Sequence, residues 1–218
     1  MSLWLTRIIP DPRSRDARRD TTGAVDLHHR MMSLFPDNLA DPEPRRRLGI
    51  LFRSEPTPAG HQILLQSTQP PDLARLPAGY GQAATKTLTP LLDALQPGLH
   101  IRYRIAANPI RKPGRTTREL YQLKAIVPLQ GAAADDWWAR QAETTGLRLG
   151  TLHSSPLDAA KGNRRSDQRP IQHHRILFEG TAVIADADRL RARLTDGIGK
   201  GKAYGCGLLS IAPHREPA

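Results

Sequence analysis

Residues 186–212 read DADRLRARLTDGIGKGKAYGCGLLSIA, and their pattern decides the fold of the second half of the chain. Asp186 can cap a helix over 187–195, because an aspartate side chain accepts hydrogen bonds from the free N–H groups of a first helical turn. Small and apolar residues then recur along one face of that helix, namely Ala187, Leu190 and Leu194. The apolar run 208–212 predicts a strand, so the order is helix, glycine-rich loop, strand.

The loop between this helix and this strand, residues 197–207, holds five glycines and two lysines. Glycine lets a backbone take positive φ and come close to a ligand, and successive free N–H groups beside a lysine bind anions, phosphate above all. Nucleotide-binding loops open a helix whereas this loop follows one, which argues against ATP or NAD and favours a phosphate on a larger molecule. The candidate phosphate ligands are Gly199, Lys200, Gly201 and Lys202. The alternative is a tight helix C-cap followed by a bulged hairpin, with no ligand.

Outward from this stretch, the second half predicts three more strands and one more helix. The strands are indicated at 99–107, at 147–153 and within 171–184. The composition of 132–145 predicts a helix that ends at Gly146. A basic loop and an extended segment, 121–129, lie between the first strand and this helix. The resulting order of strand, helix, strand, strand, helix, strand is that of a ferredoxin-like unit.

The first half fits the same order less clearly. Hydrophobic periodicity predicts a strand at 3–9, a helix at 24–35, and a strand pair at 48–53 and 62–67. Three segments lack such a periodicity: a polar, arginine-rich loop up to Gly23, the loop 69–79 in place of a second helix, and the ambiguous stretch 85–95. The predicted fold class is α+β, with two tandem ferredoxin-like (RRM-like) βαββαβ domains, residues 1–95 and 96–218, joined near Pro97-Gly98.

The formal net charge of +11 is concentrated in two stretches. Residues 102–118 contain six cations and no acid, and residues 161–175 contain five cations against Asp167 alone. Such a field favours nucleic acid as the partner, and neither stretch is an amphipathic helix that would favour a membrane. The cations expected to contact RNA are Arg102, Arg104, Arg111, Lys112, Lys161, Arg164 and Arg165. Aromatic residues make up 5% and the RNP1 pattern is absent, so recognition of a structured RNA by charge and shape is expected.

The cysteine and histidine residues limit which metal sites and disulfides the chain can form. The single Cys206 excludes an internal disulfide and a cysteine-rich zinc site. His173 and His174 are adjacent, and adjacent strand residues face opposite sides of a sheet, so they are interpreted as ordinary strand residues. No apolar run approaches transmembrane length and no signal peptide pattern is present. A soluble, cytoplasmic protein without metal or other cofactor is expected.

Two neighbouring histidines, His28 and His29, lie on the predicted helix 24–35. At 100° per residue the buried face of this helix consists of Leu27, Met31, Leu34 and Phe35. His28 falls on the flank of that face and His29 on the solvated side. From this pattern alone, a boundary histidine bonded to a backbone carbonyl is favoured over a catalytic one.

Short segments spread over nearly the whole chain have a distinctive order and spacing. They are LWLT at 3–6, SRDARRD at 14–20, LH at 27–28, LFP at 34–36, LLQS at 64–67, ANP at 107–109, LFEG at 177–180, GIG at 197–199 and GCGLLSIAP at 205–213. In this order and spacing the chain resembles the CasE-type CRISPR repeat-RNA endoribonucleases of type I-E systems.

The resemblance implies two tandem ferredoxin-like domains that bind the stem-loop of a CRISPR repeat transcript and cut it at the base of the stem without a metal ion. It also implies that the mature guide RNA stays bound, together with other subunits of a type I-E surveillance complex. It makes His28, facing the glycine-rich loop, the expected catalytic residue and reverses the preference above. Some members carry a tyrosine one helical turn before this histidine; here Val25 stands in its place, and Tyr204 is a candidate substitute.

The implied chemistry suits an imidazole. The ribose 2′-OH attacks the adjacent phosphorus and expels the 5′-oxygen, which leaves a 2′,3′-cyclic phosphate and a 5′-hydroxyl. Histidine can take the first proton or give the second near neutral pH, and the sequence leaves open which. The segment 161–175 reads as a hairpin that contacts RNA, or as a solvated loop. Two other functions stay open: an RNA-binding subunit with weak or no cleavage, and a ribosome- or tRNA-associated basic protein.

Overall fold

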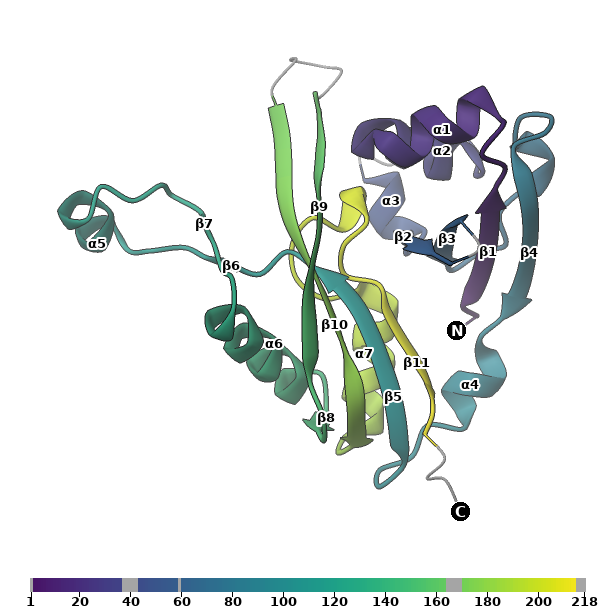
Figure 1. Cartoon of the computed structure of the whole chain (residues 1–218). Helices are drawn as coiled ribbons and strands as arrows, with labels where there is room; N and C mark the ends of the chain where they lie inside the picture. The colour runs from purple at the N-terminus through teal and green to yellow at the C-terminus, as the bar shows by residue number, and fades with distance from the viewer. Residues whose placement is uncertain (1, 37–42, 59, 164–169, 215–218) are drawn as a thin grey trace.

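The computed structural model describes residues 2–36, 43–58, 60–163 and 170–214. Its first sheet has the strand order β2-β3-β1-β4, with every neighbouring pair antiparallel (Figure 1). The strands are β1 (Trp4–Pro10), β2 (Leu51–Thr57), β3 (Gly60–Ser67) and β4 (Gly81–Thr87). This is the order of a ferredoxin-like sheet, and the predicted strands at 3–9, 48–53 and 62–67 are confirmed.

Three helices accompany this sheet: α1 (Arg15–Thr22), α2 (Ala24–Ser33) and α3 (Pro44–Arg47). The predicted buried face of the second helix is confirmed, because Leu27, Met31, Leu34 and Phe35 all lie in the core formed with strand residues such as Ile63. Between β3 and β4 the described chain forms a single 3-10 turn, η1 (Leu73–Arg75). The second helix of a ferredoxin-like unit is therefore reduced to one turn here, as the loop-like sequence predicts.

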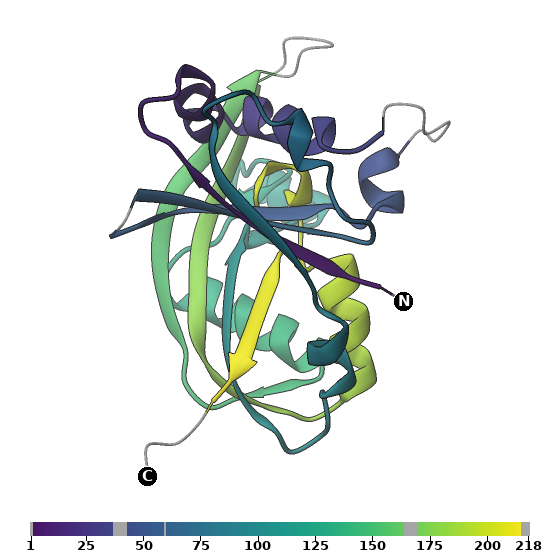
Figure 2. The same cartoon turned by 90° about the vertical axis from the view of Figure 1, so that its right-hand side faces the viewer.

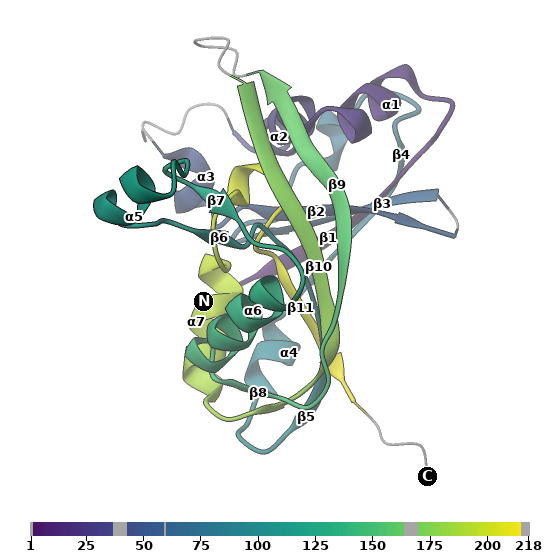
Figure 3. The same cartoon turned by 60° about the vertical axis from the view of Figure 1, so that its left-hand side comes forward.

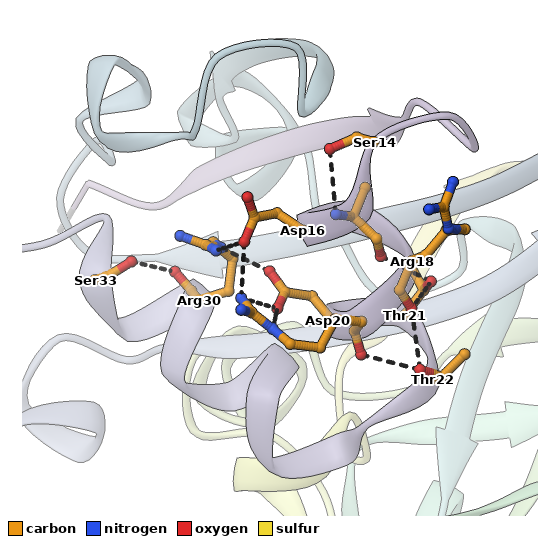
Figure 4. Close-up of polar contacts among 10 residues, drawn as sticks. Ser14, Asp16, Arg18, Asp20, Thr21, Thr22, Arg30 and Ser33 are labelled. Atoms are coloured by element: carbon orange, nitrogen blue, oxygen red, sulfur yellow. Dashed lines mark hydrogen bonds and ion pairs between the residues drawn. The ribbon is translucent and has the colours of Figure 1, made fainter.

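The prediction of a polar loop up to Gly23 is wrong, because residues 15–22 form α1. Ser14 caps this helix by accepting a hydrogen bond from the Ala17 N–H. The fully buried carboxylate of Asp20 accepts hydrogen bonds from Arg19 at 2.8 Å and from Arg30 of α2 at 2.6 Å (Figure 4). The alternating charges that suggest a loop in the sequence are thus paired within and between two helices.

The second sheet repeats the topology of the first, with the order β11-β5-β10-β8. Its strands are β5 (His100–Ala107), β8 (Leu147–Leu149), β10 (Pro170–Ile184) and β11 (Leu209–Pro213). Helices α6 (Ala132–Thr144) and α7 (Ala187–Asp196) share one core with this sheet, and Figure 2 shows α6 behind β11 and α7 to the right of it. Asp186 caps α7 by accepting from the N–H groups of Asp188 and Arg189, as predicted. The fold is therefore two tandem ferredoxin-like units, while a boundary at residues 95/96, within the connection through α4 (Thr89–Asp93), stays a prediction.

Two segments of the second half differ from the predictions. The strand expected at 147–153 is two strands, β8 and a separate β9 (His153–Asn163), both paired with β10. The mostly exposed β9 lacks the alternation that marks a half-buried strand, and pairing with β10 holds it. The expected basic loop and extended segment form an arm, residues 110–128, of a short ribbon and one helix. Its elements are β6 (Ile110–Arg111), α5 (Arg115–Leu120) and β7 (Val127–Pro128), and Figures 1 and 3 show the arm projecting from the body.

A buried ionic cluster joins the two units. The Arg53 guanidinium of β2, 2% exposed, donates to the carbonyl oxygens of Arg104 at 3.0 Å and Leu208 at 3.2 Å. Glu55, also buried, lies 3.4 Å from Arg53 and 3.1 Å from Arg104. Because Leu208 directly follows the glycine-rich loop, this cluster ties that loop to the first sheet.

Candidate active site and nucleic-acid interface

His28 is held at the edge of the first core by its own helix. Its neighbour Leu27 is buried in that core, while His28 is half-buried and His29 exposed, as the helical period predicts. The ring of His28 lies 5.9 Å from the ring of Tyr204, centroid to centroid. Its Nδ1 is buried and, among the described residues, has no hydrogen-bond partner.

The environment of His28 favours the neutral imidazole. Burial is the main cause that lowers its pKa to about 4, and the nearby charges of His29 and Arg45 act in the same direction. At pH 7 the ring is therefore uncharged and can accept a proton.

The glycine-rich loop has the positive-φ backbone that its sequence predicts, with φ between 72° and 89° at all five glycines. A Cβ at Gly197 would lie 2.8 Å from the side chain of Leu51, and one at Gly207 would lie 2.6 Å from the Ile198 carbonyl oxygen. Glycine is therefore required at both positions for the loop to fold back against β2 and onto itself. The 3-10 turn η2 (Lys202–Tyr204) at its centre brings Tyr204 to α2.

The loop is only partly available as an anion site. The N–H groups of Ile198, Tyr204, Cys206 and Gly207 donate to backbone carbonyls. Lys202 donates to the Asp196 carbonyl at the end of α7 at 2.7 Å, and burial lowers its pKa. The exposed Lys200, with Gly199 and Gly201, faces a cleft. Lys202 therefore serves the helix end, in keeping with the C-cap interpretation, while residues 199–201 border open space and their role as phosphate ligands stays a prediction.

A second histidine belongs to the same region, although the sequence did not indicate it. The Asn108 side-chain amide lies 2.9 Å from Nδ1 of His173, and the His173 ring stacks on Tyr204 at 5.3 Å and 23°. Both histidines lie in β10, as their interpretation as strand residues predicts, and both border the same cleft. Next to them the pairing of β10 with β9 shifts register: the two steps from His173 to Arg175 on β10 lie opposite the three steps from Ala160 to Leu157 on β9, so the extra residue belongs to β9. In the sequence the two adjacent histidines were the only signal, because Asn108 and Tyr204, which contact His173, lie far from it along the chain.

A basic cleft of about 770 Å³ is lined by His173, Tyr204 and residues 199–202 of the glycine-rich loop, and His28 lies next to it through its contact with Tyr204. It lies between α3, the arm, residues 172–174 of β10 and the glycine-rich loop. Its cations are Arg45, Arg46, Lys112, Lys124, Lys200 and Lys202. Glu43 is its single carboxylate among the described residues, and that carboxylate accepts a hydrogen bond from Arg46.

The other predicted RNA ligands lie outside this cleft. Arg102 and Arg104 line a separate cleft of about 430 Å³, where Arg104 pairs with Glu55 and Glu179. Arg111 is exposed on the arm, and Lys161 is exposed on β9. Arg164 and Arg165 lie outside the described residues.

The hairpin of β9 and β10 reaches the site helix at Val25. A Cβ at Gly162 of β9 would lie 2.7 Å from Cγ2 of Val25, so the strand backbone packs directly on this side chain. The position where some relatives have a tyrosine is therefore covered by the hairpin here, and Tyr204 is the aromatic ring that adjoins His28.

Within the described ranges, no group of three or more His, Cys, Asp or Glu side chains is placed to hold a metal ion. Similarly, none of the helices in the described part of the chain is long and apolar enough to cross a membrane.

Tandem ferredoxin-like units with a histidine, a tyrosine and a basic glycine-rich loop at one cleft define the class of two-domain, RRM-like proteins with a polyanion-binding site. The chain belongs to the family of CRISPR associated proteins, whose model matches residues 3–213, and it is a CasE-type member of the type I-E kind.

Two relatives and one solved structure illustrate this membership. The chain is 33% identical to the CRISPR-associated endoribonuclease Cse3 of Thermus thermophilus, over 97% of this chain and 100% of that protein. It is 28% identical to the CRISPR system Cascade subunit CasE of Escherichia coli, over 90% and 96% of the two. The structure of Thermus thermophilus Cse3 bound to an RNA representing a pre-cleavage complex superposes with a TM-score of 0.79 at 31% identity, covering 98% and 100% of the chains.

Proposed function

We propose that this protein is an endoribonuclease that binds the stem-loop of CRISPR repeat RNA and cleaves it at the base of the stem. The observation that carries the proposal is the neutral, half-buried His28 beside Tyr204, next to a cleft rich in cations. Its similarity to Cse3, a CRISPR-associated endoribonuclease solved with an RNA in a pre-cleavage complex, supports an RNA substrate.

In the proposed reaction His28 is the general base. The neutral imidazole takes the proton of the ribose 2′-OH, the 2′-oxygen attacks the adjacent phosphorus, and the bond to the 5′-oxygen breaks. The products are a 2′,3′-cyclic phosphate and, after protonation of the leaving oxygen, a 5′-hydroxyl. Lys200 and the backbone of Gly199 and Gly201 stabilise the extra negative charge of the phosphorane, and no metal ion takes part.

The second histidine supplies a donor to the same phosphate. The Asn108 amide N–H donates to Nδ1 of His173, which leaves the ring proton on Nε2. That N–H can bind a phosphate oxygen in the cleft. His173 is also stacked on Tyr204, so Asn108 and His173 together fix the ring that contacts His28.

Cations that are not among the residues lining the cleft bind the stem in this proposal. Lys161, Arg164 and Arg165 of the β9–β10 hairpin contact phosphates of both strands, and Arg102, Arg104 and Arg111 add further positive field. The mature guide RNA then stays bound beside other subunits of a surveillance complex, in keeping with the similarity to a Cascade subunit. The alternative is a structured-RNA-binding subunit with weak or no cleavage.

The test is incubation with a CRISPR repeat hairpin in EDTA, followed by mapping of the product ends. We expect the wild type to cut at the base of the stem and leave a cyclic phosphate, and His28→Ala to lose about 10²–10⁴-fold in rate while binding the hairpin normally. His29→Ala removes the neighbouring, exposed imidazole and is the matched control with near-normal cleavage.

Tight hairpin binding by the wild type without cleavage would select the binding-only alternative. Equal affinity for the repeat hairpin and for a tRNA would instead indicate a basic protein of another kind.

A further inference from the structure

The arm forms one wall of the basic cleft with a regular pattern of side chains. In the ribbon, Ile110 pairs with Pro128, and residues two apart on a strand face the same side. The residues that the arm contributes to the cleft follow this spacing: Ile110, Lys112, Lys124, Ile126 and Pro128. Arg111 and Val127, which alternate with them, do not line the cleft. Ile110 and Pro128 belong to the ribbon, and Lys112, Lys124 and Ile126 to the segments that continue it, so this side of the arm is apolar near its base and cationic farther out.

The opposite wall consists of Gly199 to Tyr204 together with His173 and His174 of β10. The ribbon is fixed at its base, because the Leu129 N–H donates to the Pro109 carbonyl at 2.9 Å. Its apolar residues remain partly open to solvent, and Ile126 is 50% exposed. The residues with which the arm lines the cleft belong to neither hydrophobic core of the described chain. Their cations and apolar surface therefore face the cleft.

This combination fits unpaired nucleotides better than a duplex. A duplex keeps the faces of its bases stacked inside and presents phosphates and hydroxyls, so an apolar wall has nothing to contact. An unpaired base exposes both faces, which pack on apolar side chains while cations bind the flanking phosphates. An acidic protein segment would use the cations but gains less from a flat apolar wall.

We propose that the cleft between the arm and the glycine-rich loop binds a single-stranded RNA segment that continues from the stem. The bases lie on Ile110, Ile126 and Pro128, and Lys112 and Lys124 bind the phosphates. The proposal rests on the proposed function, because the cleft adjoins Tyr204 and therefore the place assigned to the scissile phosphate. The arm would then hold the strand on one side of the cut and set its direction.

The experiment uses the full chain as the cleavage-deficient His28→Ala variant. Fluorescence anisotropy measures its affinity for three RNAs. They are the repeat hairpin alone and the same hairpin with about six unpaired nucleotides at its 5′ or its 3′ end. We expect one extension to strengthen binding about tenfold, and Lys112→Ala/Lys124→Ala to abolish that gain with less than about twofold effect on the bare hairpin. The salt dependence for the extended RNA should also fall by about 1.4 in slope, for two single-strand phosphate contacts.

Two further variants test the contribution of the apolar wall to binding separately from that of the cations. Ile126→Asp should lose the gain, and Ile126→Leu should keep it. The matched charge control is Lys86→Ala/Arg140→Ala, which removes two exposed cations outside the cleft and should retain it.

Three results would overturn the inference: no gain from either extension, an equal loss on bare and extended hairpins, or a gain that survives the Lys112 and Lys124 substitutions. The first would leave the cleft to a protein partner, and the second would place the stem in it. Failure of the parent protein to bind the bare hairpin would count against the proposed function instead.

Discussion

The ring of Tyr204 lies 5.9 Å from that of His28, although the two residues belong to different ferredoxin-like units. His28 is carried by α2 of the first unit and Tyr204 by the glycine-rich loop of the second. The site therefore exists only when the units pack together, and each residue that fixes this packing also affects the site.

The first prediction concerns pH. Because burial lowers the pKa of His28 to about 4, a general base at this position stays active well below the ordinary histidine range. We expect the acid limb of kcat/KM, which reports the free enzyme, near pH 4 rather than near 6.5. A rate that instead falls steadily from pH 5 to pH 8 would mean that His28 acts as the acid.

The second prediction concerns Tyr204. Tyr204→Phe keeps the ring against His28, whereas Tyr204→Ala exposes the imidazole to water and should raise its pKa toward the ordinary value of about 6.5. Titration of the His28 ring by NMR measures this pKa in both variants. It should stay near the wild-type value in Tyr204→Phe and rise in Tyr204→Ala. An unchanged pKa in Tyr204→Ala would show that Tyr204 does not shield the imidazole.

The third prediction concerns Arg53. Arg53→Met leaves the buried carbonyl oxygens of Arg104 and Leu208 without their donor, so we expect the free energy of unfolding to fall by about 3 kcal/mol. Denaturant titration measures this, and the cleavage rate should drop as the glycine-rich loop loses its anchor. Arg102→Met, at an exposed position on β5 of the second sheet, is the control and should change stability by less than about 0.5 kcal/mol.

The fourth prediction concerns Asp20. Its buried carboxylate holds Arg19 and Arg30, so Asp20→Ala should lower the free energy of unfolding by about 3–5 kcal/mol. The more exposed Asp16 takes part in the same cluster, and Asp16→Ala should cost about 1 kcal/mol or less. Equal losses in the two variants would argue against a special role for the buried carboxylate.

The fifth prediction concerns the contact between hairpin and helix. In Gly162→Ala the new Cβ would lie 2.7 Å from Val25, so we expect a loss of about 1–3 kcal/mol in unfolding free energy. The double variant Gly162→Ala/Val25→Ala should recover most of it, because the clashing methyl group is removed. Absence of recovery would place the strain elsewhere.

Local pattern in the sequence determined much of this protein. The glycine spacing at 197–207 required positive φ, Asp186 marked a helix start, and the period of 24–35 separated half-buried His28 from exposed His29. These features depend on residues within a few positions of one another, which is why they can be inferred without the fold. The order of such elements was enough for the tandem ferredoxin-like class.

Only the tertiary structure decided how distant segments meet. The helix at 15–22 forms because Asp20 pairs with Arg30 of the next helix, and β9 is a strand because β10 pairs with it. Likewise the bond of His173 to Asn108, the stacking of His173 on Tyr204 and the contact of Tyr204 with His28 all join residues far apart in the chain. Burial then sets the pKa of His28, and burial is a property of the packed chain rather than of its local sequence.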